Sequence, residues 1–292
     1  MAYGKHSITR NRWRVLAHSL RRNRGAMAGL MVILLLTAGA CLAGFLFDYD
    51  TDIVGLNISE KLIPPCREHW FGTDDLGRDL FARVLYGTRY SLSIGFAATV
   101  FSLAVGGLFG VVSGYIGGMT DEVVMRLNDI LSAVPAIMLG IVIAAALGGS
   151  AGNLILAIGL SGTPQFVRIT RAAVLTARSQ DYVEALRCSG LPEWRILFLH
   201  ILPNCMSPVI VQVSLRIAAF IIAISSLSFL GLGVPVPAPE WGNMLNQGRQ
   251  FIRMAPYMTF FPGLAILITV LAFNLFGDGL RDALDPKLMY RR

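Results

Sequence analysis

The chain has 292 residues, of which 54% are hydrophobic and 15% charged, and its formal net charge is +7. A soluble protein carries about a quarter charged residues, so this composition predicts an integral membrane protein. The positive charges flank apolar runs instead of forming one basic face, which argues against nucleic acid as a partner. The four cysteines form no CxxC pair, and we expect neither a disulfide framework nor a metal site.

Six apolar runs approach the length of about 20 residues that a helix needs to cross a bilayer. No other secondary structure satisfies the backbone of such runs in lipid, so we expect an all-α membrane protein with six transmembrane helices. Between the third and fourth runs stands only the sequence GGSAG, which predicts a tight helical hairpin. The expected spans are 26–47, 91–114, 130–148, 151–167, 213–232 and 258–277. The first is longer than a signal-peptide core of about 7–15 residues, and we interpret it as an uncleaved span.

The positions of Lys and Arg predict the orientation, because these residues are enriched in cytoplasmic segments. Both termini and the long loop 170–206 are then cytoplasmic, and the acid-rich segment after the first span is outside. The expected parts are a basic N-terminal segment (1–25), the first span (26–47), an extracytoplasmic segment with an amphipathic helix (48–90), a five-helix core (91–280) and a cytoplasmic tail (281–292).

Ionisable residues are scarce inside the predicted spans. No Asp, Glu, Lys or His lies deep in any of them, and Arg216 and Asp278 stand near predicted cytoplasmic ends. Ion-coupled carriers and channels usually need such groups along their path. This scarcity argues against a stand-alone secondary carrier or channel, which stays the alternative of another class.

One face of the second span consists of small residues at four-residue spacing. Small side chains allow another helix to approach closely. The partner is either another helix of this chain or a second subunit. The residues are Ser102, Gly106, Gly110 and Gly114.

The cytoplasmic stretch 181–204 predicts two short helices joined by a glycine. Asp181 and Glu184 resemble a capping box, and Gly190 is suited to the left-handed residue that ends the first helix. Pro192 suits the first turn of a second helix, which Pro203 is expected to end. The second helix has an apolar face at helical spacing, made of Trp194, Leu197, Phe198 and Ile201. So much apolar surface predicts a docking site, or else a hairpin lying flat on lipid.

Sequence 184–204, EALRCSGLPEWRILFLHILPN, resembles the coupling loop of ABC importer permeases. That loop has Glu-Ala-Ala, three residues, Gly, nine residues, Ile, one residue and Leu-Pro. Five positions match and two depart, with Leu186 at the second alanine and His200 at the isoleucine. HWFGTDDLGRDLFARVLYGTRYSL (69–92) and SFLGLGVPVPAPEWGNML (228–245) resemble the dipeptide/oligopeptide/nickel branch of the same family. The resemblance reaches the tail LRDALDP (280–286).

The resemblance implies the type I importer permease fold in a bacterial inner membrane. It also implies a heterodimer with a homologous second permease, two cytoplasmic ATPases and an extracytoplasmic solute-binding protein. The chain lacks a G-x-x-x-x-G-K-[ST] phosphate loop, so we expect no enzyme activity, catalytic residue or cofactor in it, and ATP and Mg on the partner ATPases. The cargo implied is a di- or oligopeptide, with nickel, a metal chelate or an opine as alternatives.

Three sets of residues follow from the resemblance. The set for ATPase coupling is Asp181, Glu184, Ala185, Gly190, Trp194, Leu197, Phe198, His200 and Pro203. A second set has two possible roles: it faces the binding protein and the outer gate, or it only packs internally. Its members are Gly72, Asp74, Gly77, Arg78, Asp79, Trp241, Gly242 and Asn243. The set for the translocation path, small and uncharged, is Ser225, Ser226, Ser228 and Asn274.

Overall fold

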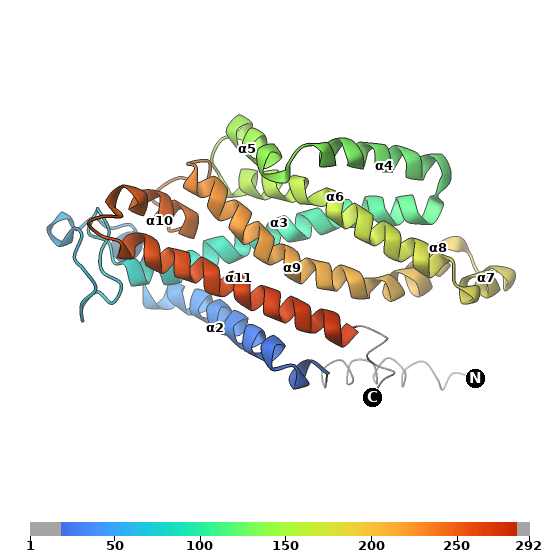
Figure 1. Cartoon of the computed structure of the whole chain (residues 1–292), viewed down its shortest axis with the longest axis horizontal. Helices are drawn as coiled ribbons and strands as arrows, with labels where there is room; N and C mark the ends of the chain where they lie inside the picture. The colour runs from blue at the N-terminus through green and yellow to red at the C-terminus, as the bar shows by residue number, and fades with distance from the viewer. Residues whose placement is uncertain (1–18, 285–292) are drawn as a thin grey trace.

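The computed structural model describes residues 19–284, which form an elongated bundle of helices (Figure 1). Most of the basic N-terminal segment and the last eight residues of the predicted tail therefore lie outside the described residues. The helices are α2 (Arg24–Leu46), α3 (Leu80–Ile116), α4 (Gly118–Ala133), α5 (Ala136–Leu147), α6 (Ala151–Arg178), α7 (Asp181–Cys188), α8 (Glu193–Arg195), α9 (Leu202–Phe229), α10 (Trp241–Gly248) and α11 (Tyr257–Leu284). Four short helical turns are η1 (Tyr49–Ile53), η2 (Ile58–Glu60), η3 (Ile196–Ile201) and η4 (Arg249–Phe251).

The number of spans differs from the six expected. Within residues 19–284, four helices are long and apolar enough to cross a membrane: α2, α3, α11 and the continuous run Glu193–Phe229. The pair α4 and α5 would be a fifth, bent by 83°. Helix α6 occupies the place of the expected fourth span and packs against α5, as the predicted hairpin requires. The count of six is not confirmed.

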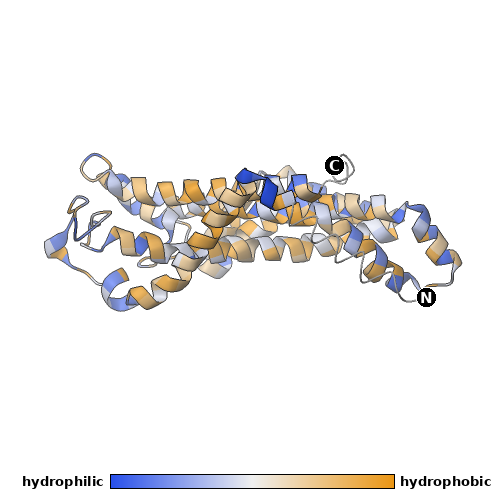
Figure 2. Ribbon diagram, turned by 90° about the horizontal axis from the view of Figure 1, so that it is seen from below, coloured by the Kyte–Doolittle hydropathy of each residue, from blue (hydrophilic) through white to orange (hydrophobic). Residues whose placement is uncertain are grey.

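Helix lengths explain the shape of the bundle. At 1.5 Å per residue, α2 is about 34 Å long and α3 about 55 Å long. The bundle of α3, α6 and α9 therefore extends well past the start of α2 and the end of α11, and α7 and α8 lie at its tip (Figure 1). We call this tip the coupling end, and the opposite end, with α10 and segment 48–79, the outer end. Hydrophobic residues dominate the middle of the bundle, and hydrophilic residues are more frequent toward its ends (Figure 2).

The amphipathic helix expected within 48–90 is not a separate element. Its residues are the first turns of α3, which continue into the span without a break. Asp79 begins this helix, because its side chain accepts a hydrogen bond from the Ala82 N–H at 2.9 Å. The external segment thus ends at residue 79, and α3 is one rod that joins it to the coupling end.

The small-residue face of α3 packs against α6. A Cβ atom at Gly106 would lie 2.6 Å from the Thr163 carbonyl oxygen, and one at Gly110 would lie 2.7 Å from that of Val167. The Ser102 hydroxyl donates to the Gly159 carbonyl oxygen. The expectation of a partner helix within this chain is therefore confirmed, and this face is not free for a second subunit.

Candidate functional site

Helix α7, the first half of the coupling segment (181–204), begins one residue earlier than expected. Gln180 precedes the helix, and no side chain caps it, so the predicted capping box at Asp181 and Glu184 is wrong. Both acids instead lie in the first turn, where they interact favourably with the positive end of the helix dipole. Gly190 does adopt the predicted left-handed conformation, with φ of +76°.

The second half of the coupling segment is not a separate short helix. The backbone continues from Glu193 through the π-helical turn η3 into α9. Pro192 precedes this run and does not lie in its first turn, and Pro203 stands in the first turn of α9 instead of ending a helix. A proline is tolerated there, because it directly follows the π-helical turn, where the regular α-helical hydrogen bonds are already interrupted. The predicted terminator is therefore wrong, and the segment is joined directly to a membrane span.

Buried apolar side chains attach the coupling segment to the bundle. Val183 of α7 and Ile196 and Ile201 of η3 are fully buried in one cluster with Val174 of α6. Leu186 and Leu197 are partly buried against the same cluster. Leu197 and Ile201 therefore do not share an outward face with Trp194 and Phe198, because the wider π turn changes the register of the helix. The expectation that Leu197 fills a partner's groove is not supported.

The exposed part of the coupling segment is still apolar. Trp194 is 58% exposed, Phe198 59% and Leu199 63%. Glu184 and Ala185 are also exposed, and Leu199 is a member of this surface that the sequence did not reveal. His200 is half-buried, and its carbonyl oxygen accepts a hydrogen bond from the Asn204 side chain at 2.8 Å. The surface matches what a partner protein would cover.

Polar contacts hold the two halves of the coupling segment together across Gly190. The Arg187 guanidinium contacts the Glu193 carboxylate at 3.0 Å, and the Tyr115 hydroxyl donates to the same carboxylate. Tyr115 is close to the end of α3, so the second of these contacts comes from a distant part of the chain. Sequence reasoning missed this cluster, since the only local signal is an Arg and a Glu six residues apart.

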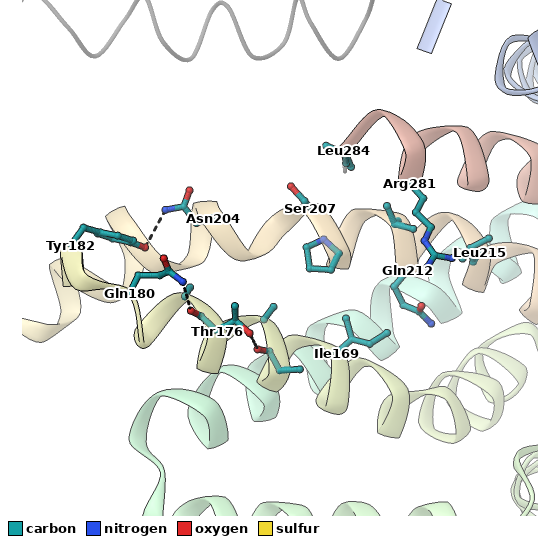
Figure 3. Close-up of a pocket in the computed structure, with 15 residues that line it drawn as sticks. Ile169, Thr176, Gln180, Tyr182, Asn204, Ser207, Gln212, Leu215, Arg281 and Leu284 are labelled. Atoms are coloured by element: carbon teal, nitrogen blue, oxygen red, sulfur yellow. Dashed lines mark hydrogen bonds between the residues drawn. The ribbon is translucent and has the colours of Figure 1, made fainter. Parts of the chain in front are cut away.

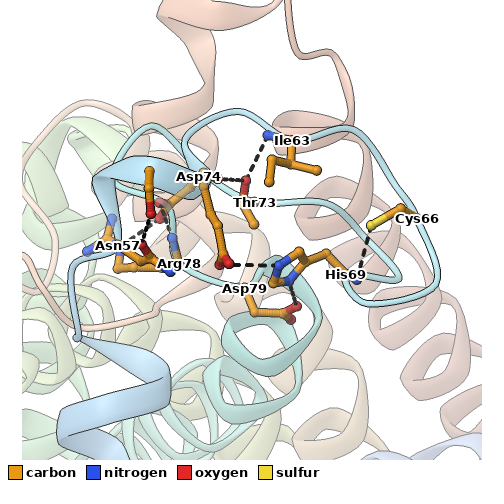
Figure 4. A network of polar contacts seen from close by, with 10 residues as sticks. Asn57, Ile63, Cys66, His69, Thr73, Asp74, Arg78 and Asp79 are labelled. Atoms are coloured by element: carbon orange, nitrogen blue, oxygen red, sulfur yellow. Dashed lines mark hydrogen bonds and ion pairs between the residues drawn. The ribbon is translucent and has the colours of Figure 1, made fainter.

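The external segment folds around a tight turn before α3 (Figure 4). The Asp74 carboxylate accepts backbone hydrogen bonds from Leu76 and Arg78 and pairs with the Arg78 side chain at 2.6 Å. His69 lies between two carboxylates, 2.7 Å from Asp79 and 3.4 Å from Glu60. Gly72 and Gly77 have φ of +79° and +77°. The predicted turn at 72–79 is therefore present, and Asp74 and Arg78 are buried inside it.

Trp241, Gly242 and Asn243 form the first turn of α10. Trp241 is fully buried, and its indole N–H donates to the Val84 carbonyl oxygen of α3 at 2.9 Å. A Cβ atom at Gly242 would lie 2.4 Å from the Ser225 carbonyl oxygen of α9. These positions correspond to the internal-packing alternative, because the side chains contact other parts of this chain.

The sequence did not single out Glu240, the residue before α10. It is fully buried, and its carboxylate accepts hydrogen bonds from the N–H groups of Gly242 and Asn243 at 3.0 and 2.9 Å. Burial raises the pKa of Glu240 above its ordinary value. The sequence shows that a glutamate stands where α10 begins, so its capping role could have been predicted. The burial of Glu240 could not have been predicted from the sequence.

The residues expected along the path do not share one face. Ser225 and Ser226 line a cavity of about 380 Å³ near the outer end, between α9, α10 and α11. Ser228 is fully buried beside Gly233, and Asn274 is half-buried on α11 and does not line this cavity. The structure therefore brings together only two of the four.

A larger groove of about 1050 Å³ lies toward the coupling end, between α6, α9 and α11 (Figure 3). Its polar lining includes Thr176, Gln212 and Arg281. The Asn204 amide donates to the Tyr182 hydroxyl at 3.2 Å at one end of it. No sequence pattern indicated this groove, because its walls come from three separated helices.

The fold is similar to that of a solved membrane transport subunit. A chain of the MetNI methionine ABC transporter, in an inward-facing conformation, superposes with a TM-score of 0.57 and 17% identity, covering 70% of this chain and 96% of that one. A second crystal form of the same transporter gives 0.56 and 18%, covering 70% and 98%. The architecture is therefore that of an ABC importer permease.

The chain belongs to the family described as binding-protein-dependent transport system inner membrane component, whose model matches residues 106–290. A second model, the N-terminal TM domain of oligopeptide transport permease C, matches residues 11–65. The family is an inner-membrane one, as expected. Membership also argues against the stand-alone carrier or channel.

Curated relatives match almost the whole chain. The dipeptide transport system permease of Alkalihalophilus pseudofirmus is 43% identical, covering 94% of this chain and 90% of the relative. The glutathione transport system permease of Pectobacterium atrosepticum is 43% identical, covering 96% and 92%. The oligopeptide transport system permease of Bacillus subtilis is 42% identical, covering 94% and 90%.

Proposed function

We propose that this chain is the permease subunit through which di- or oligopeptides cross the inner membrane. It would form the path with a homologous second permease, receive its cargo from an extracytoplasmic binding protein and be driven by two cytoplasmic ATPases. The similar permeases named for dipeptides, oligopeptides and glutathione support a peptide cargo over nickel, a metal chelate or an opine. ATP and Mg would be bound by the ATPases, and this chain would be no enzyme.

The observation that carries the proposal is the exposed apolar surface at the coupling end. Helix α8, which carries Trp194, lies on the part of the bundle that extends beyond α2 and α11 (Figure 1), and Phe198 and Leu199 belong to η3, which follows α8 directly. Lipid tails that surround α2 would not reach that far, so a hairpin lying on the membrane explains the surface less well than a docked protein. We assign this surface, together with Glu184 and Ala185, to ATPase docking.

The attachment of this surface to the bundle supports a mechanical role. Val183 and Ile196 are packed against α6, and η3 continues into α9 without a break. A displacement of α7 by the closing ATPases would therefore move two long helices together. Because interiors are close-packed, such a shift is transmitted instead of being absorbed locally. Opening and closing of the path would follow from that movement.

The test is co-purification of the complex and its ATP hydrolysis. We expect the double substitution Trp194→Ala and Phe198→Ala to reduce capture of the ATPases, because it removes the apolar surface that they would cover. Met254→Ala is the matched control, since Met254 is 78% exposed and lies outside the coupling segment. Unchanged capture and unchanged stimulated ATP hydrolysis in the double variant would contradict the docking assignment.

The cargo is tested separately. The binding protein that stimulates ATP hydrolysis by the reconstituted complex should be purified and the molecule that it carries identified by mass spectrometry. A peptide is expected, and a nickel complex or an opine in its place would overturn the peptide proposal and leave the permease role intact.

A further inference from the structure

Six aromatic side chains form a cluster at the outer end of the bundle. The members of this aromatic cluster are Phe47, Trp70, Phe71, Phe81, Phe260 and Phe261. Trp70 and Phe71 of the external segment lie 5.0 and 5.1 Å from Phe81 in the first turn of α3, measured between ring centroids. The Phe47 ring lies 6.4 Å from that of Phe81, and Phe71 stacks on Phe261 of α11 at 3.9 Å. The cluster therefore joins the end of α2, the external segment, α3 and α11.

The end of α2 marks where the hydrocarbon layer of the membrane stops. Its length of about 34 Å is close to the hydrocarbon thickness of about 30 Å. Three exposed carboxylates follow it closely, at Asp48, Asp50 and Asp52. Charged side chains are costly in hydrocarbon, so the outer boundary lies at Phe47, between α2 and these carboxylates. Because the Phe47 ring contacts Phe81, the aromatic cluster lies at this boundary.

Trp70 is 64% exposed, although it packs on one side against Phe81. Two further rings at this level are exposed as well: Phe45 in the last turn of α2 is 90% exposed, and Phe260 near the start of α11 is 60% exposed. Helix α2 is a membrane span, and the exposed side of a span faces lipid. The exposed ring of Trp70 thus stands at the edge of a lipid-facing surface.

We propose that Trp70 inserts its ring between the lipid headgroups at the outer end and anchors the external segment on the membrane surface. A tryptophan side chain combines a large apolar ring with a polar N–H group, and this combination favours the boundary between headgroups and acyl chains. Lipid is the occupant that fits, because the exposed ring is continuous with the lipid-facing side of α2. The inference does not depend on the proposed function, since it requires only a protein of the inner membrane.

The anchor acts on α3 through the residue that precedes Trp70. The His69 ring lies 2.7 Å from the Asp79 carboxylate and 3.4 Å from that of Glu60 (Figure 4). Asp79 in turn caps α3 by accepting a hydrogen bond from the Ala82 N–H. A fixed position of Trp70 at the membrane surface therefore fixes the height of the start of α3, the helix that continues to the coupling end.

The experiment measures how lipid and water reach Trp70 in the full chain, embedded in lipid nanodiscs. Lipids brominated near the headgroup, lipids brominated near the chain end, and iodide in the water quench tryptophan emission at three different depths. The emission of Trp70 is the difference between the unaltered protein and Trp70→Phe, whose ring can still pack on Phe81. Trp70→Tyr serves the same purpose if Trp70→Phe does not fold.

Trp194→Phe supplies the matched control, because Trp194 is 58% exposed but belongs to α8 at the coupling end (Figure 1). We expect lipids brominated near the headgroup to quench about half of the Trp70 emission, more than either other quencher does, because tryptophan rings settle at the headgroup level. Trp194 should lose its emission chiefly to iodide.

Three results for Trp70 would overturn the inference. Strongest quenching by iodide would mean that the ring faces water and is open to a soluble partner. Strongest quenching by bromine near the chain end would place the ring in the hydrocarbon, away from the headgroups. No quenching by any of the three would mean that protein covers the ring.

Discussion

Two glycines with the same backbone conformation show how surroundings decide the effect of a substitution. Gly77 and Gly190 have φ of +77° and +76°. A Cβ atom at Gly77 would lie 1.7 Å from the Asn57 carbonyl oxygen, whereas one at Gly190 would have no atom within 4 Å. The left-handed conformation alone costs an L-residue about 1–2 kcal/mol, and the clash adds to it only at Gly77.

We therefore expect Gly77→Ala to prevent correct folding of the external segment, and Gly190→Ala to lower stability by no more than about 1–2 kcal/mol. Thermal unfolding of the purified variants in detergent measures the difference. Equal losses in the two variants would show that the Asn57 backbone moves away at no cost.

Glu240 should make stability depend on pH in an unusual direction for a carboxyl group. Its pKa is raised in the folded protein because of burial, so between the ordinary glutamate pKa of 4.5 and the raised value the folded state holds more protons than the unfolded one. Stability from this group is thus present at low pH and is lost as the pH rises through that window. Glu240→Gln should remove this slope, measured as unfolding temperature against pH. An identical slope in the variant would show that Glu240 is not the cause of this pH dependence.

The contact between α3 and α6 depends on which glycines face it. Gly106 and Gly107 are neighbours, but a Cβ atom at Gly106 would lie 2.6 Å from the Thr163 carbonyl oxygen, whereas at Gly107 its nearest neighbour would be Leu103 at 3.6 Å. Alanine in an open helical site is worth about 1 kcal/mol over glycine, and overpacking costs about 1–3 kcal/mol.

The two alanine substitutions should therefore have opposite signs. We expect Gly107→Ala to raise the unfolding temperature slightly and Gly106→Ala to lower it. A stabilising effect of Gly106→Ala would mean that α3 and α6 separate readily, which would contradict the close packing described above.

Attachment of α7 to the bundle depends on one fully buried side chain, Val183. Replacing it by alanine removes two methyl groups from the cluster that contains Ile196 and Ile201, a loss of about 1–3 kcal/mol. We expect Val183→Ala to reduce the peptide transported per ATP hydrolysed more than it reduces ATPase binding, because the docking surface stays exposed. Cys188→Ala, an exposed site on the same helix, is the control. A normal transport ratio in Val183→Ala would show that α7 needs no such attachment.

Native cysteines at the two ends of the bundle allow the predicted orientation to be tested across the whole protein. Cys66 is exposed in the external segment, and Cys188 is exposed at the end of α7. A membrane-impermeant maleimide should label Cys66 in intact cells and Cys188 only in inverted vesicles, where bound ATPases should slow the reaction. Cys66→Ser and Cys188→Ser identify each labelled site. Labelling of Cys188 from outside would reverse the topology derived from the basic residues.

Sequence reasoning located the coupling segment but not its outward face. The left-handed Gly190 was predicted correctly, because turn chemistry is local, whereas the capping box at Asp181 and Glu184 was wrong, because the helix begins one residue earlier. Leu197 and Ile201 were assigned to a docking face on α-helical spacing, but in η3 Ile201 is fully buried and Leu197 is partly buried against the same cluster. The contacts of Glu193 with Arg187 and Tyr115 were not foreseen, since one of the partners lies 78 residues away.

Composition, apolar runs and turn residues were sufficient to establish a multi-helix membrane protein, most of its helix positions and its family resemblance, because hydrophobic length and backbone preference act over neighbouring residues. The packing of distant segments alone decided which faces are buried. It placed the small-residue face of α3 against α6, Trp241 beneath the outer surface, and Glu240 within hydrogen-bond distance of Ser91. The Glu240 carboxyl group is buried because α3, α9 and α10 pack together around it and exclude water, and no single stretch of sequence contains those three helices.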